Sequence, residues 1–275
     1  MNESARLIAL GKKQFEAEIL PELERQKLID KILVYLCGSA SLGFADENSD
    51  IDFDVLVSGK ITVDEYSFLR EIFADDYQIE SKRVSYGFDL KKKFGEYLRS
   101  ERENYWEDFN PYNLYMINHY VPVLDISVRL GELKKELGFY PKDIFISVVR
   151  GLWITVNDSG EYNSLQCFKR GNFIGADIFF YRGVEALLRL VFVMNDQYYP
   201  PTKWLSAGLQ NITNQFETDK LLQTEDKKFE EKYALFMQSY RLMSEYLIQN
   251  NILEKECVEN YGKNFAKDYY IFETF

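Results

Sequence analysis

The stretch Cys37-Gly38-Ser39-Ala40-Ser41-Leu42-Gly43-Phe44-Ala45-Asp46-Glu47-Asn48-Ser49-Asp50-Ile51-Asp52-Phe53-Asp54 carries the strongest signal in the chain. The apolar run 32–36 before it is long enough to form one buried strand. After it, apolar side chains alternate with Asp50, Asp52 and Asp54, and this period of two predicts a second strand with three carboxylates on one face.

Three like charges on one strand face repel one another and are costly to bury. A divalent cation among them relieves the repulsion, since carboxylate oxygens are the ligands such ions prefer. The Gly38-Ser39 turn between the two strands exposes backbone N–H groups, which suit phosphate. Carboxylates that hold a metal beside a phosphate-binding turn indicate phosphoryl or nucleotidyl transfer.

This pattern, Gly-Ser followed after ten residues by Asp-Ile-Asp at the start of a strand, closely resembles the signature of the nucleotidyltransferase superfamily with the DNA-polymerase-β-like fold. Within that superfamily, it looks like the small bacterial branch of minimal nucleotidyltransferases and antibiotic adenylyltransferases. The strict match covers residues 32–57. The resemblance implies an α+β fold, in which a small mixed-sheet domain is followed by an all-helical domain.

The resemblance also assigns roles to residues. Gly38 and Ser39 would contact the triphosphate, and Asp50 and Asp52 would bind two Mg²⁺ ions and act in catalysis. ATP or another nucleoside triphosphate would be the substrate. One departure is Leu42. Relatives often carry Arg at this position, before the second glycine, so leucine removes one possible phosphate contact.

Members of the superfamily usually carry a third carboxylate on a following strand. The segment 82–90 contains only Asp89, which we predict as the third catalytic acid; Glu80 is the alternative, and the absence of any third acid is another. Asp54 is an extra acid on the face of Asp50 and Asp52. We interpret it as solvated or helix-capping rather than as a further ligand.

The rest of the chain divides into a predicted nucleotidyltransferase-like α/β domain at 1–125 and a helical substrate-binding domain at 126–275. Thr62 and Glu65 form the pattern of a capping box at the start of a helix. Residues 158–160, Asp-Ser-Gly, are typical of a turn.

In the helical half, the segment 198–205 resembles the Tyr…Lys-Trp segment of a poorly characterised bacterial branch of these proteins. Lys203 is therefore predicted as a nucleotide contact that reaches the triphosphate as a point charge; a surface lysine beside a core Trp204 is the alternative.

Composition and net charge limit the kinds of molecule that this protein is expected to bind. The chain has 275 residues, 46% of them hydrophobic, and a formal net charge of −11. An acidic balance disfavours nucleic acid and favours a small or cationic acceptor. No apolar run approaches the roughly 18–20 residues of a membrane span, so no membrane partner is expected. The N-terminus lacks a signal-peptide pattern, and we expect a cytoplasmic protein.

The sequence therefore predicts an Mg²⁺-dependent nucleotidyltransferase that transfers a nucleoside monophosphate, AMP from ATP in the leading hypothesis, to a hydroxyl of a small molecule. An aminoglycoside-like antibiotic is one such acceptor. Two alternatives stay open: an adenylyltransferase that modifies a protein partner, as antitoxin-type relatives do, and a catalytically weak nucleotide-binding regulatory protein.

Overall fold

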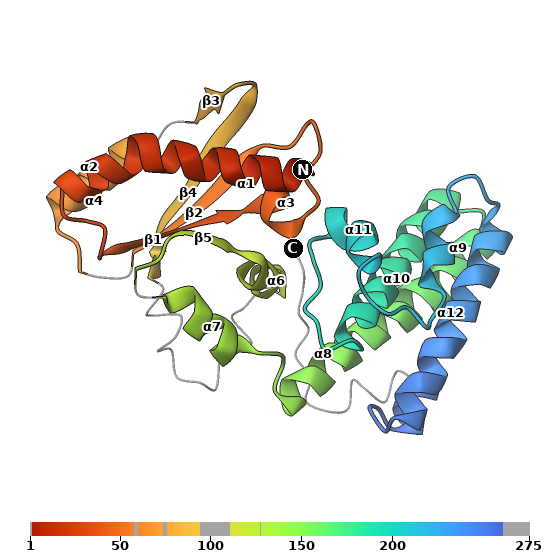
Figure 1. The fold of residues 1–275 in the computed structure, drawn as a ribbon. Helices are drawn as coiled ribbons and strands as arrows, with labels where there is room; N and C mark the ends of the chain where they lie inside the picture. Colours follow the sequence, from red (N-terminus) through yellow and green to blue (C-terminus); the bar gives the residue numbers. More distant parts are fainter. Residues whose placement is uncertain (1, 58–59, 74–75, 94–110, 127, 261–275) are drawn as a thin grey trace. The chain divides into compact units, whose positions relative to one another are not determined.

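The computed structural model describes residues 2–57, 60–73, 76–93, 111–126 and 128–260 (Figure 1). Their contacts divide the chain into two compact units. The first lies within Met1–Phe109 and Asn113–Gly138, and the second lies within Asn110–Tyr112 and Phe139–Phe275. The first unit contains a mixed sheet and the second is helical, which confirms the predicted α+β class.

The sheet of the first unit has five strands in the described residues, in the order β3-β4-β2-β1-β5. Their bounds are β1 Ile32–Cys37, β2 Ile51–Val57, β3 Tyr77–Ile79, β4 Lys82–Lys93 and β5 Val121–Leu124. Strand β1 pairs antiparallel with β2 and with β5, whereas β2 and β4 run parallel. Strand β2 therefore lies in the middle of the sheet, with a neighbour on each side.

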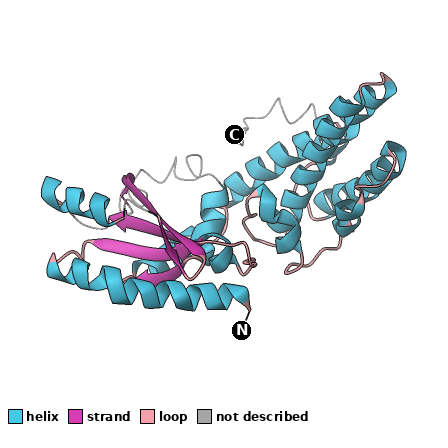
Figure 2. Ribbon diagram, turned by 90° about the horizontal axis from the view of Figure 1, so that it is seen from above, coloured by secondary structure: helices cyan, strands magenta, loops and turns pink. Residues whose placement is uncertain are grey.

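Helices cover the sheet, as seen edge-on in Figure 2. In the first unit they are α1 Glu3–Gln14, a π-helical segment Phe15–Ile19, α2 Leu20–Arg25, α3 Gly38–Leu42, α4 Val63–Ile72, the end of α6 Pro111–His119, and α7 Arg129–Leu137. A Cβ added to Gly11 of α1 would lie 3.0 Å from Ile51 and 3.2 Å from Phe53. Helix α1 therefore packs closely on the apolar face of β2, the face opposite to the one that carries Asp52.

The start of helix α4 agrees with the sequence. The backbone N–H of Glu65 donates to Thr62 Oγ1 at 3.2 Å, and the Glu65 carboxylate accepts from the Thr62 N–H at 2.7 Å. This reciprocal pair is the predicted capping box. Lys31 donates to the same carboxylate at 2.6 Å. This hydrogen bond is the largest cause of the lowered pKa of Glu65.

The second unit is a helical bundle built around α10. Its helices are α8 Lys142–Thr155, a π-helical segment Val156–Asn163, α9 Ser164–Lys169, α10 Phe173–Val193, α11 Leu205–Leu209, α12 Phe229–Gln249 and α13 Lys255–Glu259, with 3₁₀ turns at Thr202–Trp204 and Thr218–Gln223. From Val184 to Val193, all but one of the α10 residues are buried. The exception, Glu185, pairs with the buried Arg189 at 2.7 Å. None of the helices that the structure describes is long and apolar enough to cross a membrane.

The turn predicted at 158–160 is wrong, because the chain continues there as the π-helical segment between α8 and α9. Gly160 lies against Gly183 of α10, and a Cβ added to Gly183 would come within 2.3 Å of the Gly160 Cα. The glycine at 160 thus allows two helical segments to approach closely, a role that short-range sequence signals do not separate from a turn.

We expect Gly183→Ala to destabilise the second unit by about 1–3 kcal/mol or more, since the added methyl overpacks the contact with Gly160. Gly131→Ala in α7 is the matched control, because a Cβ there meets nothing closer than 3.8 Å. The control should be neutral or up to about 1 kcal/mol more stable. Urea unfolding monitored by circular dichroism measures both; equal stabilities would contradict the close contact.

Candidate functional site

Gly38 is the residue at which the chain leaves β1 and enters α3, and it lies directly against Asp52. Its φ is +66°, and a Cβ at this position would lie 2.3 Å from Asp52 Oδ2. The antiparallel register pairs Cys37 with Asp52 across β1 and β2, which brings the turn to the carboxylate. Only glycine fits there without strain or collision. The predicted phosphate turn and a predicted metal ligand thus lie in contact.

The turn that contains Ser39 is held by its own hydrogen bonds. Ser41 Oγ donates to the Gly38 carbonyl at 3.1 Å, and the Phe44 N–H donates to the Ser39 carbonyl at 3.0 Å. Gly43 ends α3 with a φ of +79°. Ser39 itself is half-buried at the start of this short helix.

Strand β4 lies beside the aspartates on the other side of β2. The parallel register pairs Asp52 with Ser85 and Asp54 with Gly87. Ser85 Oγ donates to Asp52 Oδ1 at 2.7 Å. The Asp52 carboxylate is therefore positioned from two sides, by Ser85 at one oxygen and by Gly38 at the other.

Asp54 is half-buried within β2 and does not cap a helix, which corrects that part of the interpretation from sequence. The Tyr120 hydroxyl donates to Asp54 Oδ2, and a Cβ at Gly87 would lie 2.7 Å from Oδ1. The Tyr120 ring stacks on Tyr35 of β1, with the centroids 5.5 Å apart. Burial first, and then the neighbouring Asp54, raise the pKa of Tyr120, so that it stays protonated and donates.

The third carboxylate is not among the described side chains next to Asp52. Asp89 belongs to β4, but its side chain lies outside the described residues, so its catalytic role stays a prediction. Glu80, the alternative, is exposed and accepts from Arg6 Nη1 of α1 at 3.0 Å. In the part of the chain that the structure describes, no three acidic, histidine or cysteine side chains cluster as a metal site.

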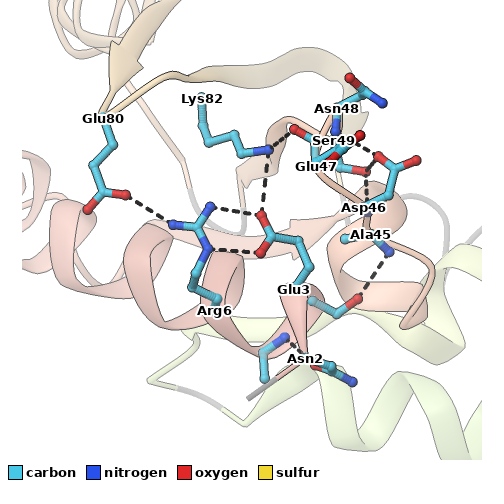
Figure 3. Close-up of polar contacts among 12 residues, drawn as sticks. Asn2, Glu3, Arg6, Ala45, Asp46, Glu47, Asn48, Ser49, Glu80 and Lys82 are labelled. Atoms are coloured by element: carbon cyan, nitrogen blue, oxygen red, sulfur yellow. Dashed lines mark hydrogen bonds and ion pairs between the residues drawn. The ribbon is translucent and has the colours of Figure 1, made fainter.

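The loop that precedes Asp50 is held by hydrogen bonds within itself (Figure 3). Asp46 Oδ1 accepts from the Asn48 N–H at 2.9 Å and from Ser49 Oγ at 3.0 Å, and the Asp46 N–H donates to Ser49 Oγ at 3.0 Å. These contacts are the turn chemistry expected of Asp, Asn and Ser. Such a turn limits how far Asp50, the next residue, can move.

The same loop is also anchored to β4 and to α1. The buried Lys82 donates to the Glu47 carbonyl at 2.5 Å, and its Nζ lies 3.6 Å from Glu3 Oε1 (Figure 3). Arg6 Nη2 donates to the same Glu3 oxygen at 2.8 Å. Hydrogen bonding from Arg6 is the largest cause of the lowered pKa of Glu3. Side chains from β4 and α1 therefore anchor the backbone just before the aspartates.

The donors at Asp50 and Asp52 fit a divalent cation such as Mg²⁺. Both carboxylates are half-buried, with Asp50 directly before β2 and Asp52 near its start, and Mg²⁺ prefers such hard oxygen donors. Asp52 Oδ2 faces the volume that a side chain at Gly38 would fill, so glycine leaves this oxygen accessible on that side.

Lys203, the predicted nucleotide contact, belongs to the second unit. It lies in the turn Thr202–Trp204 with its Nζ 5.3 Å from the centre of the Trp204 ring, and it is exposed. The cation–π contact fits either interpretation of this lysine, so its contact with nucleotide stays a prediction.

Four residues around the aspartates were not predicted from the sequence as parts of the site: Lys82, Arg83, Ser85 and Tyr120. In the segment 82–90, the family resemblance pointed only to a third carboxylate. The alternation of Arg83, Ser85 and Gly87 was nevertheless visible as one face of a strand, and it could have pointed to the neighbours of the aspartates.

Two segments of this chain match known protein families. Residues 17–108 match the nucleotidyltransferase domain family, and residues 106–205 match a family described as a domain of unknown function, DUF4037. The segment 17–108 is thus a nucleotidyltransferase domain, as the Gly-Ser and Asp-Ile-Asp motifs within it predicted. The narrower resemblance to antibiotic adenylyltransferases stays a prediction.

A crystal structure of a nucleotidyltransferase-like protein from Exiguobacterium sibiricum 255-15 is similar over 90% of this chain and 80% of that one. The sequence identity is 14% and the TM-score is 0.45. The comparison with curated proteins finds no match.

We expect Gly38→Ala to abolish binding of Mn²⁺ with a non-hydrolysable nucleotide, because its methyl collides with Asp52 Oδ2. Gly43→Ala is the matched control: its φ of +79° carries a similar backbone penalty of roughly 1–2 kcal/mol, but a Cβ there meets nothing within 4 Å. Electron paramagnetic resonance of bound Mn²⁺, with thermal unfolding alongside, separates the two effects. Equal binding by both variants would contradict the role of Gly38.

Lys82→Met should lower the free energy of unfolding by about 1.5–3 kcal/mol, since it removes a charge-assisted bond to the Glu47 carbonyl while keeping an apolar stem. It should also weaken metal–nucleotide binding, because the loop before Asp50 loses an anchor. The exposed Lys60→Met is the control and should change neither quantity. A destabilised variant with undiminished binding would show that the anchor does not act on the site.

Proposed function

We propose that this protein is an Mg²⁺-dependent nucleotidyltransferase that transfers a nucleoside monophosphate to a hydroxyl group. The observation that carries the proposal is the contact between Gly38 and the Asp52 carboxylate. It brings a turn suited to phosphate and an acid suited to a metal within one site. The match of residues 17–108 to the nucleotidyltransferase domain supports the same reaction.

In this mechanism, Asp50 and Asp52 hold the metal, and Ser85 orients Asp52 through its hydrogen bond. The backbone of Gly38 and the hydroxyl of Ser39 bind the phosphates. When bound, Mg²⁺ offsets charge on the phosphates and favours loss of the acceptor's proton. The acceptor oxygen forms a bond to the α-phosphorus, the bond between that phosphorus and the bridging oxygen breaks, and pyrophosphate leaves. The hydroxyl proton passes to solvent.

We further propose ATP as the nucleotide and a small, cationic hydroxyl compound as the acceptor, in the chemical class of the aminoglycosides. The net charge of −11 supports a cationic acceptor, because opposite charges attract the two partners during encounter. The cytoplasm is the proposed location of the reaction.

Asp50→Asn and Asp52→Asn should each lower turnover by at least about 100-fold, since metal stabilisation of the transition state is worth several kcal/mol. The measurement is pyrophosphate release from ATP, GTP and CTP against aminoglycosides, lincosamides and nucleotides as acceptors. The exposed Asp30→Asn provides a control for a general loss of negative charge. Wild-type turnover in the Asp50 or Asp52 variant would rule out this mechanism.

A second candidate is a nucleotide-binding regulatory protein with little or no turnover. It is favoured by the residue across from Asp52 on β4, which is Ser85 rather than an acid. Calorimetry would distinguish the two: Mg²⁺-dependent nucleotide binding without pyrophosphate release for any acceptor supports the regulatory protein.

A further inference from the structure

Arg83 of β4 lies on the sheet face of the aspartates. It precedes Ser85 by two residues, so the strand period directs both side chains to one face, the face on which Ser85 contacts Asp52. The hydrogen bond to Asp76 is the largest cause of the raised pKa of the Arg83 guanidinium. The negative charges of Asp50 and Asp52 raise this pKa further. Arg83 is thus electrostatically coupled to both predicted metal ligands.

The guanidinium of Arg83 is held at the surface by Asp76, just before β3. Its Nε donates to Asp76 Oδ2 at 2.8 Å, and its Nη2 donates to the same oxygen. The two side chains are 59% and 45% exposed. Exposed pairs of this kind are worth roughly 0–1 kcal/mol, so a stronger anionic ligand can displace the carboxylate.

The proposed substrate needs a cation at this place. A nucleoside triphosphate carries about four negative charges, and the one Mg²⁺ that accompanies it in solution offsets two, so a net negative complex approaches Asp50 and Asp52. The neighbouring Lys82 is buried and donates to the Glu47 carbonyl. Arg83 is exposed, and its planar fork matches phosphate oxygens.

We propose that Arg83 binds the phosphates of the metal–nucleotide complex, and that Asp76 holds its guanidinium at the edge of the site until nucleotide displaces it. This inference rests on the proposed function, because it requires a nucleotide at Asp50 and Asp52. It adds a specific phosphate-binding residue on β4, together with a carboxylate that competes with the nucleotide for it.

The test uses the full-length protein and isothermal titration calorimetry with α,β-methylene triphosphate analogues of ATP, GTP and CTP in Mg²⁺; the analogue that binds wild type most tightly is kept. Arg83→Gln should weaken its binding about 10-fold or more, the loss of one charge-assisted contact. Arg83→Lys should fall between Arg83→Gln and wild type. Asp76→Asn should bind as tightly as wild type or more tightly, since it removes the competitor.

Controls separate the possible outcomes. Arg70→Gln, an exposed arginine of α4, should bind like wild type, and thermal unfolding should confirm that each variant is folded. If Arg83→Gln binds like wild type while Asp50→Asn does not bind, the inference on Arg83 is wrong and the proposed function stands. If Asp76→Asn weakens binding as much as Arg83→Gln, the pair supports the strand and the inference is also wrong. If wild type binds no analogue, both proposals are wrong.

Discussion

The approach of the Gly38 backbone to the Asp52 carboxylate is the constraint on which the site depends. It arises from strand pairing, because the antiparallel register of β1 and β2 sets Cys37 opposite Asp52. The chain must then turn immediately above a charged group, with a φ of +66° and no room for a Cβ. A residue other than glycine would change the turn and the carboxylate together. The Gly-Ser and Asp-Ile-Asp motifs are therefore parts of a single contact, although they lie ten residues apart in the sequence.

The sequence was sufficient for features that depend on local signals. The alternation after Asp50 predicted β2, and the Thr62–Glu65 spacing predicted a capping box, because period and cap chemistry act within a few residues. The neighbours of Asp52 on β4 were not predictable in this way. They depend on a parallel register between segments more than thirty residues apart, and one residue of slip would turn Ser85 to the other face.

The two glycines that were interpreted from sequence illustrate the same limit. At Gly38, the flanking strands and the acids that follow made the turn recognisable. At Gly160, the Asp-Ser-Gly triplet looked like a turn, yet the residue lies within a helical segment that approaches Gly183 of α10. The physical need is the same at both positions, since a neighbouring atom occupies the volume of the Cβ. Only the identity of that neighbour differs, and it comes from a distant part of the chain.

Lys82 and Arg83 are adjacent cations on β4 whose different environments follow from the strand period. Successive side chains point to opposite faces, so Lys82 faces α1, whereas Arg83 lies on the face of the aspartates. On the side of α1, Lys82 is buried and its charge is committed to Glu47 and Glu3. On the other side, Arg83 is exposed, and among the described residues its charge is held by the weak pair with Asp76. A buried, committed cation can only support the backbone, whereas an exposed one that is weakly held can exchange its partner. The alternation of one strand therefore separates the support of the loop before Asp50 from the positive charge that a nucleotide would require.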